Sequence, residues 1–265
     1  MKYVVCYSGG HSSALAAVET VKRHGVENTI LLNHDISPKV EHTDIKRFKD
    51  EVAAYLGLPI HYANMASWEN LTPLKIAVMK KGFQYKPGQA LCTYYLKTQP
   101  FYSWLSDNFP ARDCVIVYGF DGGEQHRADR RESALAAMGY RTEFPLLPGD
   151  HVITDIETIG IKRPCTYATQ KHANCAGCLK AGRQHWYWVY CQHPAIFEEA
   201  MAAEIYIGHS IIKGIYLDEL LPLFQRMEDY GIAPQDIERP QTFWARVKRK
   251  MKEEYDQPEV RNYDL

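Results

Sequence analysis

The chain has 265 residues, a length that predicts one or two domains. Hydrophobic residues make up 46% and charged residues 24%, a globular composition that excludes an intrinsically disordered chain. The net charge of -1 excludes a polybasic nucleic-acid coat protein but allows a local basic face. No apolar run approaches the ~18 residues of a membrane helix, and Ser8-Gly9-Gly10 comes too early for a signal peptide. We therefore expect a cytoplasmic protein that contacts no membrane.

The first half of the chain alternates predicted strands and helices. Short apolar, β-branched runs predict strands over residues 2–7, 29–33, 59–62 and 114–119. Apolar residues at helical spacing predict helices around residues 14–21, 45–55 and 124–138, each ending at a glycine. Strands that alternate with helices predict an α/β fold with a doubly wound parallel sheet, covered on both faces.

The sequence changes in character beyond residue 150. Residues 161–194 are rich in Cys, His, Tyr and Trp and show little periodicity. The chain then reads as helical in two or three pieces, punctuated by Pro222, Pro234, Pro240 and Pro258. We therefore expect a domain over residues 1–150 and a Cys-rich, mostly helical region over residues 151–265 that packs on it as one body.

A glycine turn, Ser8-Gly9-Gly10-His11-Ser12-Ser13, joins the first strand to the first helix. Such a turn directs backbone N–H groups and the positive end of the helix at one point, where they can bind phosphate. Ser8, Ser12 and Ser13 add hydroxyl donors. The turn matches neither the Walker A motif nor Gly-x-Gly-x-x-Gly. The alternative is a purely structural turn capped by serine.

The turn resembles the pyrophosphate-binding loop Ser-Gly-Gly-x-Asp-Ser of the PP-loop ATP pyrophosphatases, the adenine nucleotide α-hydrolase superfamily. The chain resembles in particular the phosphoadenosine phosphosulfate (PAPS) reductase-like branch. Further matching elements follow in order: Asn33-His34-Asp35, the helix of residues 42–52, Cys92-Thr93-x-x-Leu96-Lys97-x-x-Pro100, Gly119-x-x-x-x-Glu124-x-x-Arg127, Phe144-Pro145-Leu146 and Asn174-Cys175-x-x-Cys178. The resemblance covers residues 3 to about 200.

This resemblance implies a nucleotide site and a set of catalytic residues. The residues implied to hold the adenine nucleotide are Ser8, Gly9, Gly10, His11, Ser12, Ser13, Asn33, Asp35 and Gly119. Lys97, Glu124 and Arg127 are implied as catalytic residues, with Arg130 and Arg131 as further cations. Bound ATP, with Mg²⁺, would be attacked at the α-phosphorus and release pyrophosphate, aided by positioning and charge neutralisation.

Each of these residues also has a simpler interpretation. The lysine and arginines can be solvated or salt-bridged, and Glu124 can face the helix dipole. Ser12 stands where the motif has aspartate, so the carboxylate that orders the turn or assists Mg²⁺ is missing. Asp35 and Asp121 are the candidates to compensate.

Seven cysteines form a second signal, because clustered cysteines in a reducing compartment bind metal or do chemistry more often than they form disulfides. Cys165, Cys175 and Cys178 supply three ligands at a spacing known from zinc and iron–sulfur sites. Candidates for the fourth ligand are Cys92, Cys191, His172 and His185, and we take Cys92. The spacing does not separate zinc from [4Fe–4S].

The resemblance favours [4Fe–4S], because adenylylsulfate reductases and the DNA phosphorothioation sulfurtransferase carry four-cysteine clusters on this fold. A redox or persulfide pair and ordinary buried thiols are the alternatives. We expect Cys6 and Cys114 to be inert in core strands.

Two segments mix basic and other side chains. Residues 180–188 combine Lys, Arg and His with Trp and Tyr, which fits a core-facing helix better than a base-stacking surface. Residues 246–252 hold five basic residues in seven, which is typical of a solvated helix face, with a nucleic-acid contact as the alternative.

These observations together predict a PP-loop enzyme that adenylates a substrate with ATP, releases pyrophosphate and is linked to sulfur transfer. One alternative is a reductase of adenylylsulfate or PAPS. Residues 261–265 lack the cysteine of the Glu-Cys-Gly-x-His-like tail of such reductases, which weighs against it. The other is a non-catalytic nucleotide-binding module with a structural metal site. The acceptor is open, with nucleic acid among the candidates, and a homo-oligomer is compatible with the sequence.

Overall fold

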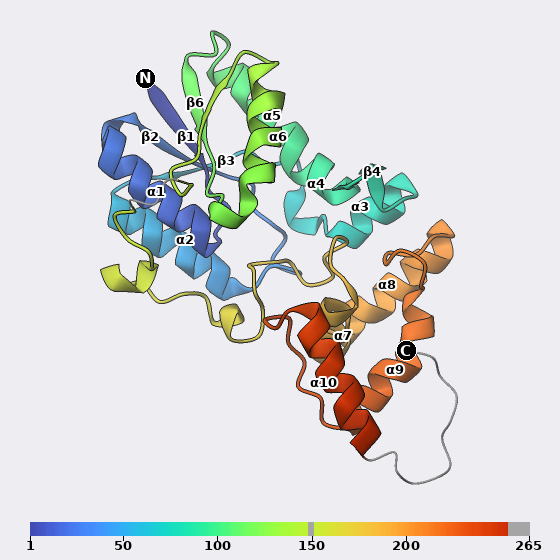
Figure 1. Ribbon diagram of the computed structural model, residues 1–265. Helices are drawn as coiled ribbons and strands as arrows, with labels where there is room; N and C mark the ends of the chain where they lie inside the picture. The colour runs from blue at the N-terminus through green and yellow to red at the C-terminus, as the bar shows by residue number, and fades with distance from the viewer. Residues whose placement is uncertain (148–150, 254–265) are drawn as a thin grey trace. The chain divides into compact units, whose positions relative to one another are not determined.

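The computed structural model describes residues 1–147 and 151–253 (Figure 1). The chain folds into two compact units, the first of Met1–Thr72 and Cys92–Tyr167 and the second of Pro73–Leu91 and Ala168–Leu265. This division differs from the predicted one at residue 150, because residues 151–167 belong to the first unit and 73–91 to the second. The predicted break at Pro258 and the tail of residues 261–265 lie outside the described residues.

The first unit contains a five-stranded sheet, in which every neighbouring pair of strands is parallel. The strand order is β3-β2-β1-β6-β7. The strands are β1 (Lys2–Cys6), β2 (Thr29–Asn33), β3 (Ile60–Tyr62), β6 (Cys114–Val117) and β7 (Arg141–Glu143). The four predicted strands are confirmed. β7 was not predicted, because it is short and polar and depends on its pairing with β6.

Helices cover both faces of this sheet (Figure 1). Val5 and Leu31 pack in one hydrophobic cluster with Phe48 of α2. Their neighbours Val4 and Leu32 point the other way, into a cluster with residues of α5 and α6. The helices are α1 (His11–His24), α2 (Thr43–Leu56), α5 (Gln99–Asn108) and α6 (Gln125–Ala136). The α/β class with a parallel sheet is therefore confirmed.

Shorter helical turns connect these elements. They are η1 (Val26–Asn28), η2 (Trp68–Asn70), α4 (Leu91–Thr93), the π-helical η3 (Tyr94–Thr98), η4 (Gly122–Glu124), η5 (Ile156–Ile159) and η6 (Cys165–Ala168). The π-helical segment ends two residues before Pro100, which has no N–H to donate to the carbonyl four residues earlier.

The second unit is mostly helical. Its elements are α3 (Pro73–Lys80), the antiparallel pair β4 (Gln84–Lys86) and β5 (Gln89–Ala90), α7 (Arg183–Gln192), α8 (Pro194–Ile207), α9 (Leu217–Asp229) and α10 (Pro240–Glu253). Trp186 and Tyr187 of α7 are fully buried, and the ring of Tyr187 lies 5.5 Å from that of Phe224. The core-facing interpretation of residues 180–188 is therefore confirmed.

One predicted helix break is wrong, because Pro222 lies inside α9. Pro222 cannot donate a hydrogen bond to the carbonyl of Asp218, but both residues are exposed, so water can satisfy that carbonyl. The buried face of Leu217, Leu220, Phe224 and Met227 holds the helix together across the proline. In the part of the chain that the structure describes, no helix is long and apolar enough to cross a membrane.

Candidate functional site

The polar residues of the glycine turn lie at the carboxyl ends of the parallel strands. β1 is the central strand, with β2 on one side and β6 on the other. The chain therefore leaves β1 toward one edge of the sheet and returns through β6 toward the other. Doubly wound proteins bind ligands beyond the carboxyl ends of the strands, at such a reversal of strand order. The turns after β1 and β6 lie at this reversal.

Two glycines of these turns are required by close packing. Gly9 has φ +79°, and a Cβ there would lie 2.7 Å from Cγ of Lys49. A Cβ on Gly119, which follows β6, would lie only 2.4 Å from the backbone oxygen of Ser12. The two turns thus meet backbone to backbone. Gly10 is less constrained, since a Cβ there would meet its nearest atoms at 3.7 Å.

The serines of the turn divide into two roles. Ser13 is buried, and its hydroxyl donates to the carbonyl of Gly10 (2.8 Å) and accepts from the backbone N–H of Ser8 (3.2 Å). Ser13 therefore holds the turn together from inside. The side chain of Ser8 is exposed and that of Ser12 is half-buried, so these two hydroxyls are the ones that can reach a ligand.

The first N–H group of α1 already has a partner within the protein. The backbone N–H of His11 donates to the hydroxyl of Tyr167 at 3.0 Å. The His11 ring is held at Nε2, which accepts from the N–H of Ile156 (3.3 Å) and lies 3.4 Å from Asp155. Burial, reinforced by the charge of Arg163, lowers the pKa of His11, consistent with a neutral imidazole. Tyr167 thus occupies the start of α1.

A cluster of charged side chains, with the buried Lys49 at its centre, packs against the glycine turn. The ammonium of Lys49, a side chain that is 1% exposed, lies 2.9 Å from Asp35 and 3.1 Å from Glu41. Lys46 contacts the same two carboxylates at 2.6 and 3.3 Å. Burial alone would raise the pKa of Asp35, but the hydrogen bonds from the two lysines lower it on balance.

This cluster bears on the missing carboxylate of the turn. Two ammonium groups already balance Asp35 and Glu41, and Oδ1 of Asp121 accepts the N–H of Gly123 in a helix cap. These arrangements do not fit a carboxylate that takes the place of the motif aspartate beside Mg²⁺.

Asn33 and His34, at the carboxyl end of β2, each make a side-chain contact with a backbone carbonyl. The Asn33 side chain is 1% exposed, and its amide donates to the carbonyl of Tyr7, directly before the turn. Its Oδ1 has no hydrogen-bond partner in the described structure. Nδ1 of His34 lies 2.6 Å from the carbonyl of Ala63. Burial, together with the charge of the exposed Lys97, lowers the pKa of His34 to about 4. Lys97 is therefore electrostatically coupled to the end of β2.

Glu124 and Arg127 form an ion pair after β6. Glu124 also completes a capping box with Asp121, which fixes the start of this helical segment. The guanidinium of Arg127 lies 4.6 Å from the centre of the Phe120 ring, which packs against the rings of both Tyr118 and Phe144. Glu124 therefore orients Arg127.

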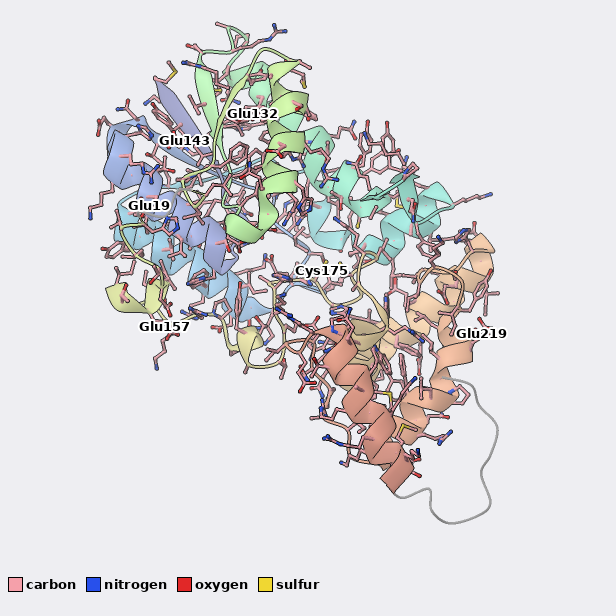
Figure 2. All side chains as sticks on the ribbon, viewed as in Figure 1. Glu19, Glu132, Glu143, Glu157, Cys175 and Glu219 are labelled. Atoms are coloured by element: carbon pink, nitrogen blue, oxygen red, sulfur yellow. The ribbon has the colours of Figure 1, made fainter. Side chains whose placement is uncertain are left out.

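The four predicted metal ligands are divided between the two units. Cys92 and Cys165 belong to the first unit, and Cys175 (labelled in Figure 2) and Cys178 belong to the second. Among residues 1–147 and 151–253, no group of three or more His, Cys, Asp or Glu side chains is arranged to hold a metal ion. The cysteine site therefore stays a prediction.

Cys165 is an exposed thiol beside the start of α2. Its Sγ lies 4.0 Å from both ring nitrogens of His42, and its backbone N–H donates to Asp44 at 2.6 Å. Partial burial, with the charge of Asp44, raises the pKa of the thiol. Cys6 and Cys114 lie in strands as predicted, and burial raises the pKa of Cys6 to about 12 and that of Cys114 to about 11. Both are therefore protonated at neutral pH.

The sequence missed Tyr167 and Lys49. Tyr167 reaches the turn from 156 residues away, and no local pattern marks it. Lys49 lies in a helix that was predicted, where a lysine on the inner face is the available signal. No protein-family model matches this chain, and no curated protein matches it.

Proposed function

We propose that this protein is an adenine-nucleotide-binding enzyme of the PP-loop, PAPS reductase-like kind, which adenylates a substrate with ATP and releases pyrophosphate. The observation that carries the proposal is the strand–glycine turn–helix unit at the reversal of strand order. There Gly9 and Gly119 let the backbone of two turns approach closely.

The residues of the turn would hold the pyrophosphate end of ATP. The hydroxyls of Ser8 and Ser12 and the positive end of α1 are the donors that the fold offers there. The hydroxyl of Tyr167 would have to yield its place on the N–H of His11 to a phosphate oxygen. Ser13, Asn33 and Lys49 would act as positioning residues, since each is buried and holds the turn from within.

Positively charged side chains would neutralise the charge that develops during the reaction. A substrate oxygen attacks the α-phosphorus, the bond to the bridging oxygen breaks, and pyrophosphate leaves with the electron pair. Lys97 and Arg127 are the cations that we assign to the developing charge, one near β2 and one after β6. A sulfur nucleophile would then displace AMP from the activated atom. This last step rests on the cysteines and on the resemblance.

Binding and turnover of ATP test the proposal. We expect calorimetric titration to show ATP binding to the full chain, and Gly9→Ala to weaken it at least ~10-fold, because the left-handed φ and Lys49 reject a Cβ. Gly182→Ala is the matched control, because nothing lies within 4 Å of its added Cβ. A wild-type protein that binds no adenine nucleotide would overturn the proposal.

Pyrophosphate release separates the enzyme from its alternatives. We expect release to require an acceptor, and Ser12→Asp, which restores the carboxylate of the motif, to increase it. ATP binding without release, under every acceptor tried, would favour a non-catalytic module. Sulfite production from adenylylsulfate or PAPS with a thiol reductant would instead favour the reductase.

A further inference from the structure

The last helix of the second unit carries an unusual concentration of positive charge. Between Arg239 and Lys252 the chain has six basic residues and no acidic one, although the whole protein has a net charge of -1. Five of the six belong to α10, which Figure 1 draws in red. The charge is therefore local to one element, and its placement on that helix decides what it can do.

The helix has one buried face and one basic face. Phe243, Val247 and Met251 are at most 4% exposed. Four other side chains follow each other at helical spacing and are all exposed: Ala245, Lys248, Arg249 and Lys252. We call Lys248, Arg249 and Lys252 the basic stripe. No large apolar side chain accompanies them on this face, so it lacks what an amphipathic helix inserts into a lipid surface.

Two other basic residues of α10 serve the fold instead. Arg246 pairs with Glu238 at 3.2 Å, and the ammonium of Lys250 donates to the carbonyl of Gly231 at 3.0 Å. In the described residues Lys248 and Lys252 form no ion pair, and they stand four positions apart, about 6 Å along the helix. These two charges are thus directed to solvent.

An aromatic side chain adjoins the basic face. Trp244 is half-buried in α10, and the guanidinium of Arg183, at the start of α7, lies 5.4 Å from the centre of its ring. Basic side chains that track a phosphate backbone, next to aromatic and arginine planes, are the usual means of binding nucleic acid without sequence preference.

We propose that the outer face of α10 binds the phosphate backbone of a nucleic acid. Lys248, Arg249 and Lys252 contact successive phosphates, and Arg183 with Trp244 extends the surface toward α7. The surface belongs to the second unit, whereas the glycine turn belongs to the first, and the inference goes beyond the proposed reaction. A protein without any affinity for ATP would leave this inference intact.

Fluorescence anisotropy with labelled 20-nucleotide single-stranded DNA, at 50 to 200 mM salt, tests it. The full chain is used, because Glu254, Asp256 and Glu259 follow the stripe in the sequence and oppose polyanion binding. We expect Lys248→Gln/Arg249→Gln/Lys252→Gln to weaken binding at least ~10-fold at 100 mM salt. The slope of log affinity against log salt concentration should fall by about 2, since each phosphate contact on a single strand contributes about 0.7.

Lys22→Gln/Lys86→Gln/Lys213→Gln is the matched control, because it removes three exposed charges from other elements. Equal losses in the two triple variants would show a general charge effect and overturn the proposal. Binding to vesicles with phosphatidylserine, with none to DNA or RNA of any form, would overturn it as well, in favour of a lipid surface.

Discussion

The interior of each of the two units is stabilised by a different kind of interaction. In the first unit, several buried polar groups gather where the strands end: Asn33 ties β2 to the residue before the glycine turn, and Lys49 lies between two carboxylates below it. In the second unit, large aromatic rings such as Tyr187, Phe224 and Phe243 pack on each other. A small change at the sheet edge should therefore alter ligand binding, whereas a small change in the aromatic core should alter stability.

The largest effect is expected from Phe224→Ala. Phe224 is fully buried among the aromatic rings of the second unit, so truncation should cost about 3–5 kcal/mol in the free energy of unfolding. ATP affinity, measured where the variant is still folded, should change less than ~2-fold. Ile205→Ala is the control, because Ile205 is 73% exposed. Urea denaturation measures the free energy of unfolding of both variants. A large loss of ATP affinity would remove the contrast between the units.

A pH-dependent effect should appear in the first unit. His34 has a folded-state pKa of about 4 against 6.5 for a free histidine, so the unfolded chain binds the proton first as pH falls. The contribution of His34 to the free energy of unfolding is therefore fully present above pH 6.5. It is lost as the pH falls from about 6.5 to 4, by up to ~3 kcal/mol. His11, with its pKa also lowered, acts in the same direction.

His34→Gln should reduce the loss of stability on acidification. Urea unfolding at pH 7 and pH 4.5 measures the free energy of unfolding of both proteins. Replacement of the exposed His126 by glutamine should leave the wild-type dependence on pH unchanged. A wild-type stability that is constant over this range would contradict the prediction.

Gly119→Ala should change both properties at once. Its Cβ would press on the backbone of Ser12, so the start of α1 must shift, at a cost of about 1–3 kcal/mol. ATP affinity should fall at least ~10-fold with it. Gly122→Ala, three residues on, has open space around its Cβ and should bind ATP like the wild type. If both variants bind alike, the close approach of the two turns does not shape the site.

The smallest effect is expected from Tyr167→Phe. The variant loses the hydroxyl that accepts the N–H of His11, at about 1 kcal/mol in stability. ATP affinity should rise a few-fold, because phosphate no longer competes with the tyrosine for the start of α1. Calorimetric titration measures this change, and a fall in affinity would instead make Tyr167 part of the binding surface.

Most elements of the first unit could be predicted, because their signals are local. The Val- and Ile-rich runs of β1 and β6 mark strands, and Gly25 and Gly57 mark the ends of α1 and α2. The second unit was harder. α7 shows no periodicity because Gln184–Val189 are buried on every side, and α9 continues through Pro222 because packing outweighs the missing hydrogen bond.

The sequence by itself determined the parallel sheet, the glycine turn and the residues that resemble a PP-loop, because each depends on a few neighbouring residues. Only the tertiary structure decided which of these residues are buried supports and which are left exposed. Ser13 and Asn33 hold the turn from inside, Lys49 and Lys46 neutralise Asp35, and Tyr167 covers the start of α1. The physical reason is that these contacts join residues far apart in the chain, whose meeting no local pattern records.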